Sequence, residues 1–292
     1  MKRIPDPKTM IAIKNLPLAA KTLIDGFMSG LNNSKLLGEG ATFSQYRNYM
    51  PGDDLRQVDW KIFGRTERYY IRQSEAEKNI AIHLMVDASA SMNHDCGGYS
   101  KVQYAAYLAA ALALLAYRQG DKVGLSIVNG AGVQRLPPRN HSLQMQRIYH
   151  ALEHMEAYGR MPPPENQKPL YHPNGKQLRI LMTDFYEHQD ELTKLLALLN
   201  ARGQETILLH LMATNELEGK FEGYDTLEDL ETGEAITLNQ AATAKGSTMA
   251  AYLEAAKRKL LRNKVHYCLV DAGQTPAAAL TAFLIRRNNV SS

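Results

Sequence analysis

The chain has 292 residues, of which 45% are hydrophobic and 22% charged, which excludes a disordered or fibrous protein and allows one large domain or a domain with an added module. Its net charge of +4 is too small to favour a protein that binds nucleic acid or a membrane surface. No stretch reaches the roughly 18 apolar residues of a membrane span, and the N-terminus lacks the apolar region of a signal peptide. The two cysteines, Cys96 and Cys268, fit no zinc or redox spacing, so we expect a cytoplasmic protein with reduced thiols.

The first part of the chain is irregular. Residues 9–30 carry an apolar stripe typical of a helix, in which Pro17 is expected to break the first turns. Turn residues then alternate with short β-prone pieces such as RYYIR, residues 68–72. We therefore predict that residues 1–78 form an N-terminal helix and a small irregular β-rich clamp module.

From residue 79 onward, short apolar strands alternate regularly with helical patterns. The predicted strands are 79–86, 121–129, 132–138, 178–184, 205–212 and 265–271. The predicted helices are 101–120, 141–155, 189–203, 248–263 and 275–287, and a small hairpin turns at ETGE, residues 231–234. This alternation predicts an α/β domain over residues 79–292, with a mainly parallel Rossmann-like sheet flanked by helices.

Two of these strands end in an acid among small polar residues. The first ends in Asp87, followed by Ser89 and Ser91, and the second in Asp184. The carboxyl ends of parallel strands meet at one edge of a sheet, and carboxylate and hydroxyl oxygens suit a hard divalent cation such as Mg²⁺. Asp and Ser at strand ends also turn the chain and cap backbone N–H groups, and the pattern alone leaves that alternative open.

This strand-end pattern resembles the metal-ion-dependent adhesion site of von Willebrand factor A-type domains. The resemblance implies that Asp87, Ser89 and Ser91 form the first ligand loop and that Asp184 supplies the last acid. The middle ligand of that family is a threonine, and the corresponding loop here, LPPRNHSLQM, contains only the hydroxyl of Ser142 as a substitute. The implied cofactor is Mg²⁺, for which Mn²⁺ or Ca²⁺ would substitute.

The upstream segment carries a second resemblance, to the bacterial family known as domain of unknown function 58 (DUF58). The residues that match its signature are Arg47, Tyr49, Pro51, Gly52, Asp53, Asp54, Arg56, Asp59, Trp60 and Arg65. The resemblance covers about residues 30–285 and is to the short form without transmembrane helices. It implies a von Willebrand factor A-like fold, no established catalytic activity, and a role with a MoxR-type AAA+ ATPase or its client protein in protein maturation or complex assembly.

The same upstream residues have a direct physical interpretation. Pro51 and Gly52 favour a tight turn, and the alternating Asp and Arg residues predict an ion-pair network in which Arg binds carboxylates bidentately. We expect Trp60 to anchor this module. Other candidates are weaker: His94, Asp95 and Cys96 are expected in a polar loop, and His83 in the core.

These observations favour a non-enzymatic protein-binding module with a Mg²⁺ adhesion-type site. The alternative is a metal-dependent phosphoesterase that uses the same strand-end acids and activates water at the cation. A nucleic-acid-binding protein is the third candidate, but acidic residues are interspersed with the basic ones of the N-terminal third. We therefore expect protein partners, no nucleic acid and no membrane span.

Overall fold

The computed structural model describes residues 6–13, 15–33, 45–48, 70–73, 80–170, 177–187, 190–200, 205–219, 226–231, 233, 235–237 and 245–290. Packing divides the chain into two compact units, one formed by Met1–Phe27 with Ile80–Ser292 and the other by Met28–Asn79. The chain up to Phe27 therefore packs with the α/β domain, whereas the sequence-based division at residue 78 placed it with the β-rich module.

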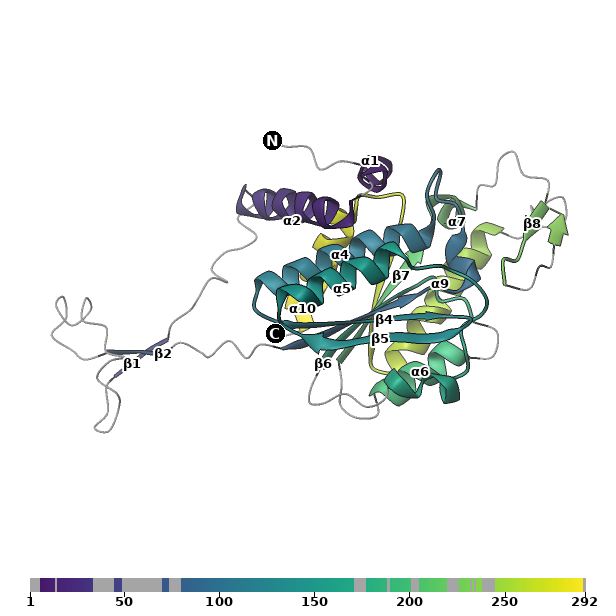
Figure 1. Ribbon diagram of the computed structural model, residues 1–292. Coiled ribbons are helices and arrows are strands. Elements are labelled where there is room, and N and C mark those ends of the chain that lie inside the picture. The colour runs from purple at the N-terminus through teal and green to yellow at the C-terminus, as the bar shows by residue number, and fades with distance from the viewer. Residues whose placement is uncertain are drawn as a thin grey trace. The chain divides into compact units, whose positions relative to one another are not determined.

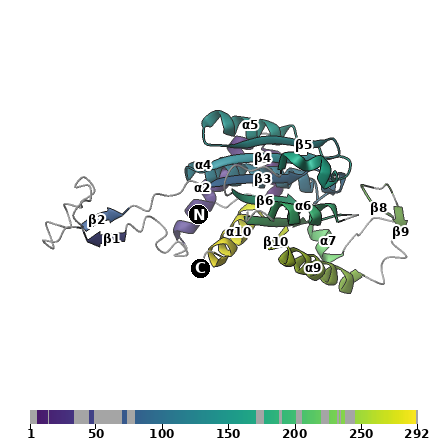
Figure 2. The same cartoon turned by 90° about the horizontal axis from the view of Figure 1, so that it is seen from below.

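A six-stranded sheet forms the centre of the larger unit, with the strand order β10-β7-β6-β3-β4-β5 (Figure 2). Its strands are β3 (Ala81–Asp87), β4 (Lys122–Asn129), β5 (Gly132–Arg139), β6 (Gln177–Thr183), β7 (Glu205–Met212) and β10 (Val265–Asp271). All neighbours pair in parallel except β4 and β5, which are antiparallel. Pro137 and Pro138 are tolerated because β5 is an edge strand. The predicted mainly parallel sheet is confirmed.

Helices cover both faces of this sheet. The main ones are α4 (Lys101–Arg118), α5 (Ser142–Glu153), α6 (Glu191–Asn200), α9 (Lys245–Arg262) and α10 (Pro276–Val290). Figure 1 shows α4 and α5 on one face and α6 on the other. Apolar residues of α6 and α9, including Leu195 and Leu260, form a buried cluster with Met85, Leu181 and Leu208 of the strands. The apolar patterns that predicted these elements are thus buried against the sheet.

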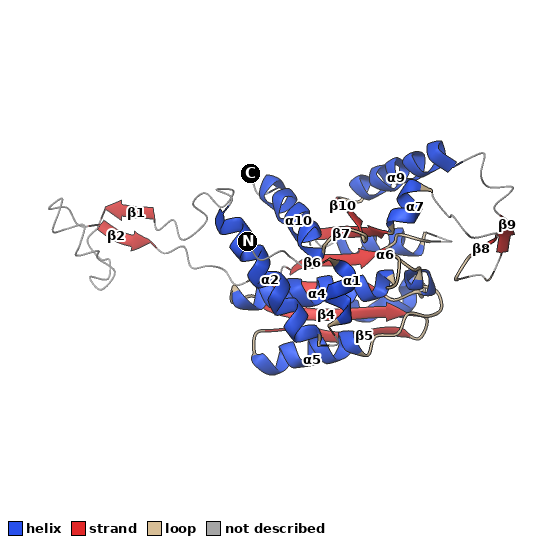
Figure 3. Ribbon diagram, turned by 90° about the horizontal axis from the view of Figure 1, so that it is seen from above, coloured by secondary structure: helices blue, strands red, loops and turns tan. Residues whose placement is uncertain are grey.

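The N-terminal segment forms two helices, α1 (Pro7–Ala12) and α2 (Leu16–Asn33), where the sequence predicted one helix with broken first turns. Asp6 caps α1, and its Oδ1 accepts a hydrogen bond from the backbone N–H of Thr9 at 2.9 Å. The hydroxyl of Tyr107 on α4 donates to the carbonyls of Ile11 and Ile13, at 3.1 and 2.9 Å. These bonds hold the break between the helices against α4, and Figure 3 shows α1 and α2 on the α4 side of the sheet.

Several smaller elements complete the described chain. The short helix α7 (Thr214–Glu218), which the sequence did not predict, follows β7 directly. The hairpin β8 (Thr226–Glu228) and β9 (Ala235–Thr237) turns at the predicted position. In the smaller unit, β1 (Gln45–Asn48) and β2 (Tyr70–Gln73) pair antiparallel. Within the described ranges, no helix combines the length and the apolar character that a membrane crossing requires.

Candidate functional site

The strands β3 and β6 lie side by side and in parallel, so their carboxyl ends meet at one edge of the sheet. Asp87 is the last residue of β3, and Thr183 is the last residue of β6, followed by Asp184. The hydroxyl of Thr183 donates to Oδ2 of Asp87 at 2.6 Å. The two strand ends therefore meet directly, as the sequence analysis expected for parallel neighbours.

The loop after β3 brings its two serines to the same place. Oδ1 of Asp87 accepts a hydrogen bond from the backbone N–H of Ser89 at 2.9 Å, and the hydroxyls of Ser89 and Ser91 lie 3.1 Å apart. The Ser91 side chain is also close enough to Asp184 to lower the pKa of that carboxyl. Four of the predicted site residues, Asp87, Ser89, Ser91 and Asp184, therefore form one connected cluster.

A buried lysine completes the cluster, and the sequence analysis missed it. Nζ of Lys101 lies 2.8 Å from Oδ2 of Asp184 and 3.1 Å from Oε1 of Glu216 on α7, and only 3% of the Lys101 side chain is exposed. Lysine is almost never buried without a partner. Its position in the sequence could have indicated this role. Lys101 is the first residue of α4, where the helix dipole disfavours a cation, so a buried lysine there needs nearby carboxylates.

Burial and charge shift the ionisation of these groups in opposite directions. Burial and the neighbouring charge of Asp184 raise the pKa of Asp87 to about 7, although hydrogen bonds from Thr183 and Ser89 act against this rise. Burial alone would raise the pKa of Asp184, but the Lys101 ammonium outweighs it and the pKa is lowered. Burial would lower the pKa of Lys101, but Asp184 and Glu216 raise it. Asp184 and Lys101 are therefore a charged pair, and Asp87 is the group that changes charge near neutral pH.

Ser142 does not join this cluster. It is exposed and begins α5, where the Gln144 side chain donates to the carbonyl of Val123 at 3.0 Å, near the start of β4. Asp87 pairs with Val128, toward the other end of that strand. Val123 and Val128 are five residues apart on β4, which corresponds to about 16 Å along the strand. Ser142 therefore lies at the edge where β4 begins, and Asp87 lies at the opposite edge, where the parallel strands end. The antiparallel direction of β5 causes this, because it returns the chain to the edge where β4 begins.

The loop after α5, not the loop before it, lies beside the cluster. The backbone N–H of Ala90 donates to the carbonyl of Gly159 at 2.8 Å, and the N–H of Tyr158 donates to the carbonyl of Ala88 at 3.0 Å. We call residues 154–160 the rim loop. Its backbone groups hold residues 88 and 90 on either side of Ser89.

We predict that Gly159→Ala distorts the rim loop and lowers the free energy of unfolding by about 1–2 kcal/mol. Gly159 has a φ of 66°, and a Cβ atom there would lie 2.8 Å from the Cα of Gly130, which is backbone that cannot swing away. Urea denaturation would measure the loss. Gly233→Ala is the control for positive φ alone, because Gly233 has a similar φ of 74° and a Cβ there would meet nothing within 4 Å; an equal loss in both variants would contradict the role of the close approach.

The described residues do not fit a divalent cation as they are arranged. Both oxygens of Asp87 already accept hydrogen bonds, and an oxygen of Asp184 pairs with the Lys101 ammonium. A Mg²⁺ ion requires about six oxygen ligands, and a fixed ammonium group beside one of the carboxylates opposes it electrostatically. We therefore assign no step to a metal ion.

The weaker sequence candidates have ordinary structural roles. Nε2 of His94 lies 3.2 Å from Oδ1 of Asn215, and Asp95 accepts a hydrogen bond from the N–H of Gly98. Burial raises the pKa of Cys96 to about 12, so its thiol stays protonated. His83 is buried, and its Nε2 lies 2.8 Å from the hydroxyl of Ser126. It is therefore the core histidine that the sequence predicted.

The upstream motif falls almost wholly outside the described residues. Arg47 lies on β1. The other signature residues lie outside the described ranges, namely Tyr49, Pro51, Gly52, Asp53, Asp54, Arg56, Asp59, Trp60 and Arg65. The predicted ion-pair network and the anchoring role of Trp60 remain predictions.

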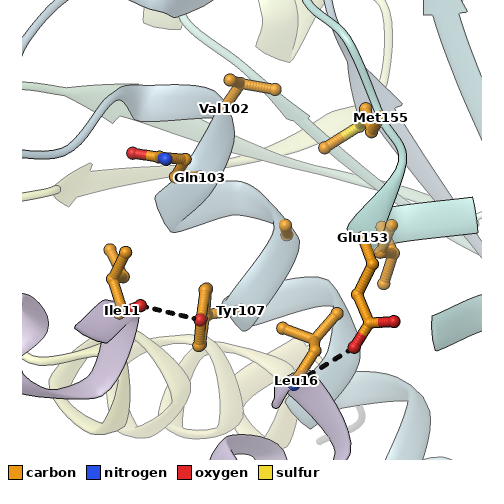
Figure 4. A pocket seen from close by; sticks show the side chains of 9 residues that line it. Ile11, Leu16, Val102, Gln103, Tyr107, Glu153 and Met155 are labelled. Carbon is orange, nitrogen blue, oxygen red and sulfur yellow. Dashed lines mark hydrogen bonds between the residues drawn. The ribbon is translucent and has the colours of Figure 1, made fainter. Parts of the chain in front are cut away.

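Two adjoining hollows lie beside the rim loop, on the face of the sheet that α4 and α5 cover. One, of about 450 Å³, is lined by residues of α1, α2, α4 and α5, and Figure 4 shows Tyr107, Leu16 and Glu153 around it. The other, of about 480 Å³, reaches Tyr158 on the rim loop. Both are lined by Val102, Gln103 and Met155, so the two hollows adjoin between the N-terminal helices and the rim loop. We call this feature the α4 groove.

Comparison with known proteins gives a family but no activity. The sequence model of a family described as "Protein of unknown function DUF58" matches residues 45–259. The uncharacterized proteins Mb1516 of Mycobacterium bovis and Rv1480 of Mycobacterium tuberculosis are each 29% identical to this chain over 234 residues, which is 79% of this chain and 73% of theirs.

Solved structures show only distant similarity. The conserved hypothetical protein BatB from Bacteroides thetaiotaomicron is 16% identical, with a TM-score of 0.45, over 71% of this chain and 98% of that chain. The pilus adhesin SpaC from Lactobacillus rhamnosus GG is 13% identical, with a TM-score of 0.46, over 73% of this chain and 31% of that chain. With TM-scores this low, we base no functional argument on either structure.

Proposed function

Because the chain belongs to the DUF58 family, whose sequence model matches residues 45–259, we propose that it is a non-enzymatic protein-binding module. Its partner would be a MoxR-type AAA+ ATPase or the client of that ATPase, and its role would lie in protein maturation or complex assembly. The α/β domain would act as a rigid scaffold for the loops at the carboxyl edge of the sheet, which is where such folds place their binding sites.

The observation that carries this proposal is the exposed aromatic side chain at the rim. Tyr158 on the rim loop is 44% exposed and lines the α4 groove, and its N–H donates to the carbonyl of Ala88, the residue after Asp87. Tyrosine is enriched at protein interfaces, where it combines a large contact area with a hydrogen-bonding group. The backbone on both sides of Tyr158 is fixed by hydrogen bonds to Ala88 and Ala90, so this contact residue is held in place before binding.

We predict that Tyr158→Ala weakens binding to the MoxR-type ATPase of the same cell by about tenfold or more. The reason is loss of a preorganised aromatic contact, and isothermal titration calorimetry with the purified ATPase would measure it. Leu143→Ala is a matched control, because Leu143 is 51% exposed but sits on α5 at the opposite edge of the sheet. Equal affinity of the wild type and Tyr158→Ala would reject the rim as the contact surface.

The phosphoesterase alternative finds no specific support among the described residues. It needs a cation that activates water beside the strand-end acids. Asp87 is instead held by Thr183 and Ser89, and Asp184 by Lys101. Incubation with a generic phosphoester and Mg²⁺ or Mn²⁺ tests it directly, and turnover that disappears in Asp87→Ala would favour the enzyme over the binding module.

A further inference from the structure

We infer that the ammonium group of Lys101 is the resident cation of the strand-end cluster and takes the place that a divalent metal ion was expected to fill. The inference concerns the occupant of the cluster and does not rest on the proposed partner. It starts from two distances: Nζ of Lys101 lies 2.8 Å from Asp184 and 3.1 Å from Glu216. These are hydrogen-bond distances of a charge-assisted pair.

Two helices, α4 and α7, fix the groups on either side of this contact. Lys101 is held at the start of α4, because the hydroxyl of Ser100 caps the helix and the N–H of Lys101 donates to the carbonyl of His94 at 3.2 Å. Glu216 is held on α7, where its second oxygen, Oε2, accepts from the N–H of Ala213 at 2.8 Å. The backbone from which the Lys101 side chain extends and the Glu216 carboxylate that it reaches are therefore both held in place.

The backbone next to Asp184 is also fixed. Nε2 of His210 on β7 lies 2.8 Å from the carbonyl oxygen of Asp184, and the N–H of Tyr186 donates to its Oδ1 at 3.3 Å. Oδ2 is left for Lys101. Asp184 is 5% exposed and Lys101 2% exposed, so the pair is shielded from solvent screening and is correspondingly strong.

The two carboxylates nearest Lys101 share its single ammonium group. Asp184 and Glu216 each contact the one ammonium group, while Asp87 is satisfied by neutral donors, the hydroxyl of Thr183 and the N–H of Ser89. A divalent ion bound to Asp184 would lie within a few ångströms of Lys101, where two positive charges repel strongly in a buried site. Metal binding therefore requires that Lys101 first leave.

The test is a titration with Mn²⁺ followed by the electron paramagnetic resonance signal of the free ion. Wild-type protein should bind no stoichiometric Mn²⁺ up to about 1 mM, which is weaker than dedicated carboxylate sites. Lys101→Ala removes the ammonium and leaves the carboxylates, so this variant should gain one site at least about tenfold tighter than any site of the wild type. Asp184→Asn in the Lys101→Ala background should abolish the new site.

Lys122→Ala is the control, because Lys122 is exposed at the start of β4, at the opposite edge of the sheet. It should bind Mn²⁺ no better than the wild type. One tight Mn²⁺ site in the wild type that is lost in Asp184→Asn would overturn the inference, as would a folded Lys101→Ala protein that gains no site. If Lys101→Ala does not fold, thermal unfolding of the wild type with and without about 10 mM Mg²⁺ replaces the titration. Equal melting temperatures support Lys101 as the resident cation. A rise in melting temperature with Mg²⁺ that Asp184→Asn removes overturns the inference.

Discussion

Lys101→Met should lower the free energy of unfolding by about 3–5 kcal/mol, which is the usual effect of removing one partner from a buried ion pair. The methionine keeps most of the aliphatic volume of lysine but leaves the carboxylate of Asp184 buried without its cation. The carboxylate of Glu216 loses the same partner. Urea denaturation followed by far-ultraviolet circular dichroism would measure the change.

A double-mutant cycle separates the ion pair from other effects of the substitution. In the Lys101→Met background, Asp184→Asn should recover part of the lost stability, because the uncompensated charge is gone. Lys122→Met, at an exposed position, should change stability by less than about 0.5 kcal/mol. A loss of under about 1 kcal/mol in Lys101→Met would show that the pair is open to water, contrary to its burial.

The sequence predicted the scaffold because its physical signals are local. Apolar runs such as the one ending at Asp87 are typical of strands buried on both faces, and the long Ala/Leu pattern after Ser100 is typical of a covered helix. The rule that parallel strands end at one edge was enough to bring Asp87 and Asp184 together. These inferences required no knowledge of distant contacts.

The occupant of the cluster was not predictable in the same way. Lys101 and Glu216 are 115 positions apart, and Glu216 lies on α7, a helix too short to give an apolar period. Ser142 was misplaced because the sequence does not reveal that β5 runs antiparallel and carries the next helix start to the other edge of the sheet. The antiparallel direction of β5 is therefore the reason that the Ser142 hydroxyl lies away from the cluster.

The ionisation of Asp87 gives the cluster a pH-dependent stability. Its pKa rises from the ordinary 3.8 to about 7, chiefly because of burial. Between these values the unfolded chain releases the proton while the folded protein retains it, so the contribution of Asp87 to stability is full below pH 3.8 and falls as pH rises toward 7. Above about pH 7 Asp87 is ionised in both the folded and the unfolded chain, so the stability lost through its ionisation no longer changes with pH.

Burial also lowers the pKa of His83 to about 3 and of His210 to about 4. Each is therefore neutral in the fold where the unfolded chain is protonated, and each lowers stability as pH falls below 6.5. These effects have the opposite sign to that of Asp87. A pH profile of the wild type alone would mix them, so only a comparison with a variant at Asp87 isolates its contribution.

Asp87→Asn should therefore stabilise the protein at pH 8, by about 2–4 kcal/mol, and should make little difference near pH 4. Asparagine can still accept the hydrogen bond from the N–H of Ser89 and carries no charge to bury. Urea denaturation of both proteins at several pH values gives the difference, in which the histidine effects cancel. Asp95→Asn, in an exposed loop position, should change stability by less than about 0.5 kcal/mol at every pH. A loss of stability in Asp87→Asn at pH 8, in the presence of a chelator, would mean that the fold favours the ionised carboxylate and would contradict the raised pKa of Asp87.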